Sequence, residues 1–133
     1  MSTIQRITSK YRLDFDSTKI DLNRESETYK EIYRKDGFGI IYSLAAEFNS
    51  DKVLVELVID DEVVLSIDCD EIAQSGNEYE FSDVLSFENS KDVLKFKPTL
   101  PIMFRESFVV RAKANGNSSS RDFERIIVER TEE

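Results

Sequence analysis

Residues 38–67 read FGIIYSLAAEFNSDKVLVELVIDDEVVLSI, and this stretch decides the fold class. Apolar residues occupy every second position from Phe38 to Phe48, which is the period of a strand with one buried face. The alternation resumes after a turn at residues 49–51, and once more after residues 60–61. Residues 53–67 are therefore expected to form a hairpin, and the short turns argue against strands that alternate with helices.

The strand expected at residues 53–59 is apolar on both faces. Val53 and the odd-numbered positions after it line one face, whereas Leu54 and Val58 make the opposite face apolar as well. This pattern predicts either a central strand or an outer face that a loop or a partner covers.

Other segments repeat the two-residue period or carry turn signals. Further strands are expected at residues 11–16, 29–36, 79–81, 84–87, 93–96, 104–114 and 123–128. Residues 19–28 are expected to form a polar loop, and residues 70–75 one helical turn ended by Gly76. Pro98 and Pro101 cannot donate ladder hydrogen bonds, so the chain is expected to change sheet between them. Together these features predict an all-β, antiparallel, jelly-roll-like sandwich of about eight or nine strands with at most one short helix.

The first expected strand alternates apolar and charged residues. Tyr11, Leu13 and Phe15 occupy one set of positions, which predicts a half-buried strand with these three side chains toward the core. Residues 1–133 are expected to form a single domain, with a flexible arm at 1–9 and a charged tail at 129–133.

The chain is acidic, with 27 Asp and Glu residues against 18 Lys and Arg and a formal net charge of −9. This charge disfavours binding to phosphate backbones and anionic lipid, so we expect neither a nucleic-acid partner nor a membrane partner. Residues 91–133 carry more basic than acidic residues, in contrast to the acidic remainder. Such an asymmetry favours head-to-tail contact between copies, although the same charges also solvate the outer faces of strands.

The residue types leave little room for catalysis. The chain has no histidine and one cysteine, Cys69, which excludes a Ser-His-Asp or Cys-His arrangement within it. Cys69 stands among acidic residues that disfavour a thiolate, so a buried, inert thiol is expected. We therefore expect a protein that is not an enzyme and that has no catalytic residues and no cofactor-binding residues.

Two kinds of acidic cluster resemble calcium sites. Asp14, Asp16, Thr18 and Glu25 match four ligand positions of a calcium-binding loop, but Lys19 stands where such a loop requires glycine. The runs at 60–62 and 68–71 could present carboxylates on loops, but hairpin-turn and helix-start chemistry is the favoured explanation of them. We expect no metal site.

An interaction surface is the alternative to a catalytic centre. The predicted interaction residues are the outward apolar positions of strand 53–59 and the basic face of strand 104–114. They are Leu54, Val58, Arg105, Arg111 and Lys113.

A resemblance to a known class of proteins covers roughly residues 37–110. It rests on Gly37-x-Gly39 before an apolar strand, on residues 55–60 followed by residues 63–67, and on Phe96-x-Pro98-x-x-Pro101-Ile102-x-Phe104-x-x-Ser107-Phe108. In style and spacing the chain resembles small β-sandwich virion proteins of tailed bacteriophages, including capsid-decoration, tail and adaptor components. It departs from them at Asp61, where such chains often have glycine. The resemblance implies an assembly role on a symmetric particle.

The sequence therefore predicts a noncatalytic structural protein, most concretely a phage virion component that forms oligomers. Its expected partners are copies of itself and neighbouring virion proteins, and its expected location is the virion, assembled in the host cytoplasm, or otherwise the cytoplasm. The alternative is a carbohydrate- or receptor-binding module that uses the turns near Asp36, Asp60 and Asn115.

Overall fold

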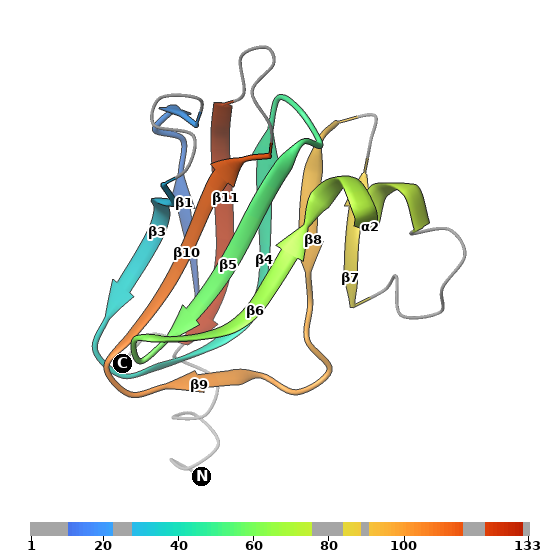
Figure 1. Cartoon of the computed structure of the whole chain (residues 1–133). Helices are drawn as coiled ribbons and strands as arrows, with labels where there is room; N and C mark the ends of the chain where they lie inside the picture. The colour runs from blue at the N-terminus through green and yellow to red at the C-terminus, as the bar shows by residue number, and fades with distance from the viewer. Residues whose placement is uncertain (1–10, 23–27, 76–83, 89–90, 116–121, 132–133) are drawn as a thin grey trace, which may run out of the picture.

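The computed structural model describes residues 11–22, 28–75, 84–88, 91–115 and 122–131. These residues form two antiparallel sheets packed face to face, with the smaller sheet in front of the larger one in Figure 1. The predicted all-β sandwich is thereby confirmed. The described residues hold eleven strands and one short helix, so the expected number of eight or nine strands was too low.

The larger sheet has the strand order β1-β11-β4-β8-β7, with β2 also paired to β11 and β9 also paired to β4. Its strands are β1 (Tyr11–Asp16), β2 (Ile20–Asp21), β4 (Gly39–Phe48), β7 (Leu85–Glu88), β8 (Val93–Phe96), β9 (Ile102–Phe104) and β11 (Asp122–Thr131). Strand β11 thus includes residues 129–131, which were expected in a charged tail. Strand β2 and the fully buried Leu22 lie in the segment expected to be a polar loop.

The smaller sheet has the order β3-β10-β5-β6. Its strands are β3 (Lys30–Asp36), β5 (Val53–Ile59), β6 (Glu62–Asp68) and β10 (Ser107–Ala114). Strand β5 lies between β10 and β6, as its two apolar faces predicted. The core between the two sheets holds the largest fully buried side chains, among them Phe48, Phe104, Phe108 and Phe123.

The buried face of β4 differs from the predicted one at its first half. Gly39 and Ile41 point inward there, whereas Phe38 is 45% exposed. The reason is a β-bulge: on β11, Glu129 pairs with Ser43 and Arg130 with Ile41, so one residue of β4 is left between them. One extra residue moves every later side chain to the other face, and a strict alternation cannot reveal it.

Gly39 is required by the packing rather than by its backbone angles. A Cβ atom at this position would lie 2.6 Å from the ring of Phe104, which belongs to the paired strand β9. The neighbouring Gly37, with a φ of 93°, forms the predicted turn between β3 and β4.

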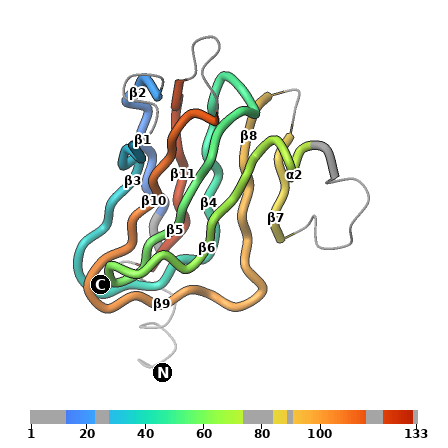
Figure 2. The backbone as a smooth tube through the Cα atoms, in the orientation of Figure 1, coloured from blue at the N-terminus to red at the C-terminus, as the bar shows by residue number. Residues whose placement is uncertain are grey.

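The proline segment does not carry the change of sheet that was predicted for it. Strands β8 and β9 both pair with β4, at residues 44–47 and 39–41 respectively. The chain leaves β4 between them and returns to it, because neither Pro98 nor Pro101 can donate a ladder hydrogen bond. It enters the smaller sheet only after β9, at residues 105–106, as Figure 2 traces.

Helix α2 (Cys69–Ser75) confirms the expected helical turn. Asp68 caps it, because its Oδ1 atom accepts bonds from the backbone N–H groups of Asp70 at 3.1 Å and Glu71 at 3.4 Å. The strand expected at 79–81, Gly76 and the arm at 1–9 lie outside the described residues.

Candidate functional site

Strand β1 presents its apolar side chains to solvent and its acidic side chain to the interior. Leu13 is 62% exposed and Phe15 is 60% exposed. Asp14, between them, has a side chain that is 23% exposed and lies against residues of both sheets. The prediction that Leu13 and Phe15 face the core is therefore wrong.

An ion pair at the margin of the core explains this orientation. Arg130 of β11 is nearly buried, and its Nε and Nη2 atoms donate to the two oxygens of Asp14 at 2.6 Å and 3.2 Å. Tyr33 of β3 donates its hydroxyl to Asp14 Oδ2 at 2.7 Å, which links the two sheets. A buried guanidinium needs a carboxylate partner, so the inward side of β1 must carry Asp14.

The same contacts shift the titration of the groups involved. Burial, followed by the hydrogen bond to Asp14, raises the pKa of Tyr33 well above that of a free phenol. The hydrogen bond to Asp14 raises the pKa of Arg130. Near neutral pH, Tyr33 therefore stays protonated and Arg130 stays positively charged, so both act as structural contacts.

The outward residues of β1 continue an apolar row across the larger sheet. Phe15 pairs with Ile127 of β11, and Ile127 pairs with Ala45 of β4. Ile127 is 40% exposed, which is high for an isoleucine near the middle of a sheet. We call the outer surface formed by Leu13, Phe15, Ile127 and Ala45 the β1–β11 face.

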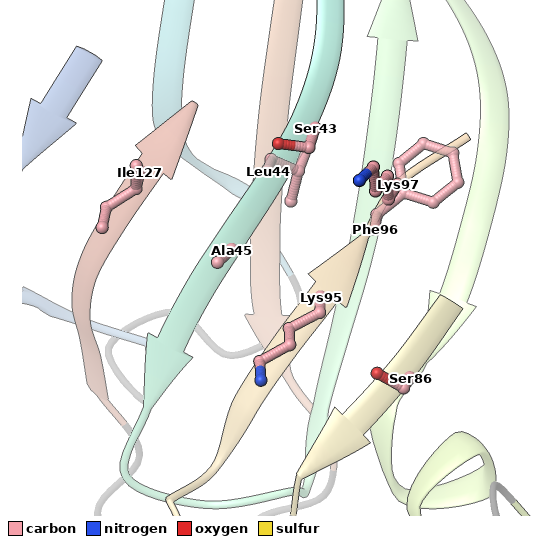
Figure 3. Close-up of a pocket in the computed structure, with 8 residues that line it drawn as sticks. All are labelled: Ser43, Leu44, Ala45, Ser86, Lys95, Phe96, Lys97 and Ile127. Carbon is pink, nitrogen blue, oxygen red and sulfur yellow. The ribbon is translucent and has the colours of Figure 1, made fainter. Parts of the chain in front are cut away.

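The row ends at a hollow of about 430 Å³ on the same sheet. Beyond Ala45 the paired positions are Lys95 of β8 and Ser86 of β7, and Figure 3 shows these short and charged side chains on neighbouring strands. The residues that line the hollow are Ser43, Leu44, Ala45, Ser86, Lys95, Phe96, Lys97 and Ile127. Small residues beside long ones make the depression, and Ile127 joins it to the β1–β11 face.

Four of the five residues predicted for interaction lie together on the outer face of the smaller sheet. Val58 is only 7% exposed and pairs with the buried Val109, while Leu54 pairs with Lys113. Arg105 lies apart from them, exposed in the turn between β9 and β10.

The basic residues of this outer face already have partners within the chain. Arg111 forms an ion pair with Glu56 at 2.8 Å. Arg111 and Lys113 both lie over the ring of Tyr29, at 5.4 Å and 4.9 Å from its centroid. These contacts occupy the two cations within the chain.

Asp14, Asp60 and Asp70, three of the acidic residues that resemble calcium ligands, make structural contacts. Asp14 holds Arg130, and Asp60 accepts the backbone N–H groups of residues 105–107 at 2.7–3.1 Å. These bonds lower the pKa of Asp60. Asp70 forms an ion pair with Lys52 at 2.8 Å, and Glu25 lies outside the described residues. Within the described ranges, no cluster of three or more acidic or cysteine side chains is arranged to hold a metal ion.

Cys69 is fully buried at the start of α2. Burial, reinforced by the charges of Asp68 and Asp51, raises the pKa of its thiol. The thiolate is therefore suppressed, as the sequence predicted.

Comparisons with known proteins do not place the chain in a family. No family model matches it, and no curated protein matches it. Among solved structures, a chain described as "Structure of infectious bursal disease virus Gx strain" is similar over 92% of this chain, with 8% identity and a TM-score of 0.36. The chain spans 33% of the length of that viral chain. A similarity this low carries no argument about function.

No helix in the part of the chain that the structure describes combines the length and the apolar character needed to cross a bilayer.

Proposed function

We propose that this protein is a noncatalytic structural subunit that assembles with copies of itself. The more specific form of the proposal is a virion component of a tailed bacteriophage, either a capsid-decoration protein or a tail or adaptor protein. That form rests on the sequence resemblance over residues 37–110, and its partners would be copies of the chain and neighbouring virion proteins.

The observation that carries the proposal is the reversed strand β1. Exposed Leu13 and Phe15 continue into Ile127, so an apolar face extends from an edge strand toward the middle of a sheet. Contiguous exposed apolar surface of this kind marks interaction sites. The Asp14–Arg130 ion pair fixes the orientation of strand β1. The exposure of Leu13 and Phe15 is therefore a stable feature of the fold, which supports a role for them in contact with another molecule.

Further support comes from the roles of the reactive residue types. The chain contains no histidine, the thiol of Cys69 is buried, and Asp14, Asp60 and Asp68 are engaged by groups of their own chain. A protein with these features acts most simply through the surfaces that it presents.

A carbohydrate-binding module is the second candidate, and the hollow beside Ile127 is the observation that favours it. Ser43, Ser86 and Lys95 bring two hydroxyl groups and one cation to its lining. The turns first considered for this role are less suitable, because Asp60 is bound to residues 105–107 and Gly37 N–H donates to the carbonyl of Glu106. Binding on a glycan array by the wild type, lost in Lys95→Glu, would support this candidate.

Light scattering tests the leading proposal. The wild-type protein is expected to have a molar mass of at least two chains of 15.4 kDa each. The Phe15→Lys variant is expected to have a molar mass closer to that of a single chain. Burying a new lysine without a partner disfavours the contact, while the exposed position leaves the fold intact.

Leu100→Lys is the matched control, because Leu100 is 78% exposed but lies in the segment between β8 and β9. It should retain the wild-type mass. A wild-type protein that remains a monomer at low and high salt, over the whole accessible concentration range, would contradict the proposal.

A further inference from the structure

Among the residues that the structure describes, strand β1 lies at one edge of the larger sheet. It ends the order β1-β11-β4-β8-β7, and among the described residues no strand pairs with its second edge. An edge strand offers a row of backbone donors and acceptors to another chain. Figure 2 shows β1 at the margin of the larger sheet, outside β11.

We propose that two copies of this chain pair through antiparallel β1 strands about a twofold axis at Leu13. This inference rests on the proposed self-assembly and names the surface and the register through which it takes place. The two larger sheets would then form one continuous sheet, and the interface would be isologous, as in most homodimers.

The sequence of β1 selects this register by charge. With Leu13 opposite its own copy, Arg12 stands opposite Asp14 at two symmetric positions. An axis at Arg12 or at Asp14 would set that residue opposite itself, and an axis at Phe15 would set Asp14 opposite Asp16. An axis at Asp14 also sets Arg12 opposite Asp16, but it retains the Asp14–Asp14 pair at its centre. Like charges directly opposite destabilise a strand pair and unlike charges stabilise it, so among these axes the one at Leu13 gives unlike pairs without a like pair.

The apolar residues of the strand agree with the same register. In an antiparallel ladder, opposite residues share a face, so Leu13 meets its copy and Phe15 stands opposite Tyr11. Aromatic pairs and aliphatic pairs across strands stabilise a sheet. The pairing therefore gives cross-strand partners to Leu13 and Phe15, which are the two most exposed apolar side chains among those that the structure describes on the larger sheet's strands.

The inward charge of Asp14 does not oppose this pairing. An unpaired charge that points inward from an edge strand protects against association. Asp14 is held by Arg130 and Tyr33 on the inner side, so it brings no uncompensated charge to the ladder. It penalises the registers in which carboxylates meet and thereby makes the pairing selective.

Cysteine cross-linking reports directly on the register in which the two β1 strands pair. Leu13→Cys would place two thiols opposite each other, with a Cα separation of about 4.5–5.5 Å, which a disulfide can bridge. Phe15→Cys is the matched control on the same exposed face, because its two copies would lie four residues apart along the ladder, at about 13 Å. The native Cys69 is buried and is not expected to react.

Both variants are oxidised in the full chain, and dimer is measured on non-reducing gels. Leu13→Cys is expected to form dimer several-fold faster than Phe15→Cys, with wild type giving none. Equal rates for the two variants would overturn the inference. So would a Leu13→Cys protein that assembles by light scattering but does not cross-link, and in that case self-assembly would stand while its β1 interface would not.

Discussion

At the scale of single residues, Asp14 decides which side of β1 faces water. Its carboxylate is bound by the nearly buried guanidinium of Arg130 at 2.6 Å and by the hydroxyl of Tyr33 at 2.7 Å. Turning the strand over would bury Leu13 and Phe15, but it would leave Arg130 without a partner in the interior. The cost of that unpaired charge exceeds the gain from two apolar side chains at the margin of a sheet, where their burial would be incomplete.

Replacing Asp14 should therefore reduce stability more than an exposed carboxylate does. Asp14→Ala is expected to lower the free energy of unfolding by about 2–4 kcal/mol, because it leaves a nearly buried guanidinium unpaired. Asp16→Ala, on the same strand, should cost less than about 1 kcal/mol, because its contact with Thr18 is exposed. Urea unfolding followed by circular dichroism measures both values, and equal losses for the two variants would contradict the role of Asp14.

At the scale of elements, the β5–β6 hairpin shows how a loop can be fixed by one carboxylate. Asp60 and Asp61 have φ angles of 52° and 68°, which define a tight turn of the type that usually contains Asn-Gly or Asp-Gly. Aspartate tolerates this conformation better than most residues. Asp60 also gains bonds from the backbone N–H groups of residues 105–107, so it joins the hairpin to the start of β10.

The hydrogen bonds of Asp60 give the fold a dependence on acid. They lower the pKa of Asp60 in the folded chain below its unfolded value of about 3.9. The stabilisation is thus complete above that value and is lost as the pH falls through the folded pKa.

Asp60→Asn keeps one acceptor oxygen but cannot titrate. Its free energy of unfolding should be lower than that of wild type at neutral pH, and should fall less steeply between about pH 5 and pH 2. Unfolding curves measured at several pH values test this, with Asp61→Asn as the control at the neighbouring turn position. Parallel pH profiles for wild type and Asp60→Asn would refute the assignment.

At the scale of the whole molecule, the sequence predicted the positions of strands and turns better than it predicted which side chains are exposed. The Asp36-Gly37 turn, the strands on either side of Asp60-Asp61 and the burial of Cys69 followed from local rules of turn chemistry and period. The inward side of β1 could not be found in this way, because alternation predicts that the apolar side is buried, whereas the buried side of β1 carries Asp14.

Partners distant in the sequence made the difference. Asp14 and Arg130 are 116 residues apart in the sequence, and their contact places the acidic side of β1 toward the interior. The bulge in β4 depends on its register with β11, and Gly39 depends on the ring of Phe104. The β1–β11 face was not predicted for the same reason. The interaction surface expected on Val58 and Arg111 of the smaller sheet stays a prediction, and Arg111 there forms an ion pair with Glu56.

Imaging of the assembled protein at side-chain resolution tests the central claim most directly. The account predicts that copies meet at the free edge of strand β1, with Leu13 beside a second Leu13 at a twofold axis. Assembled copies in which strand β1 pairs with no other copy, or pairs in another register, would contradict it.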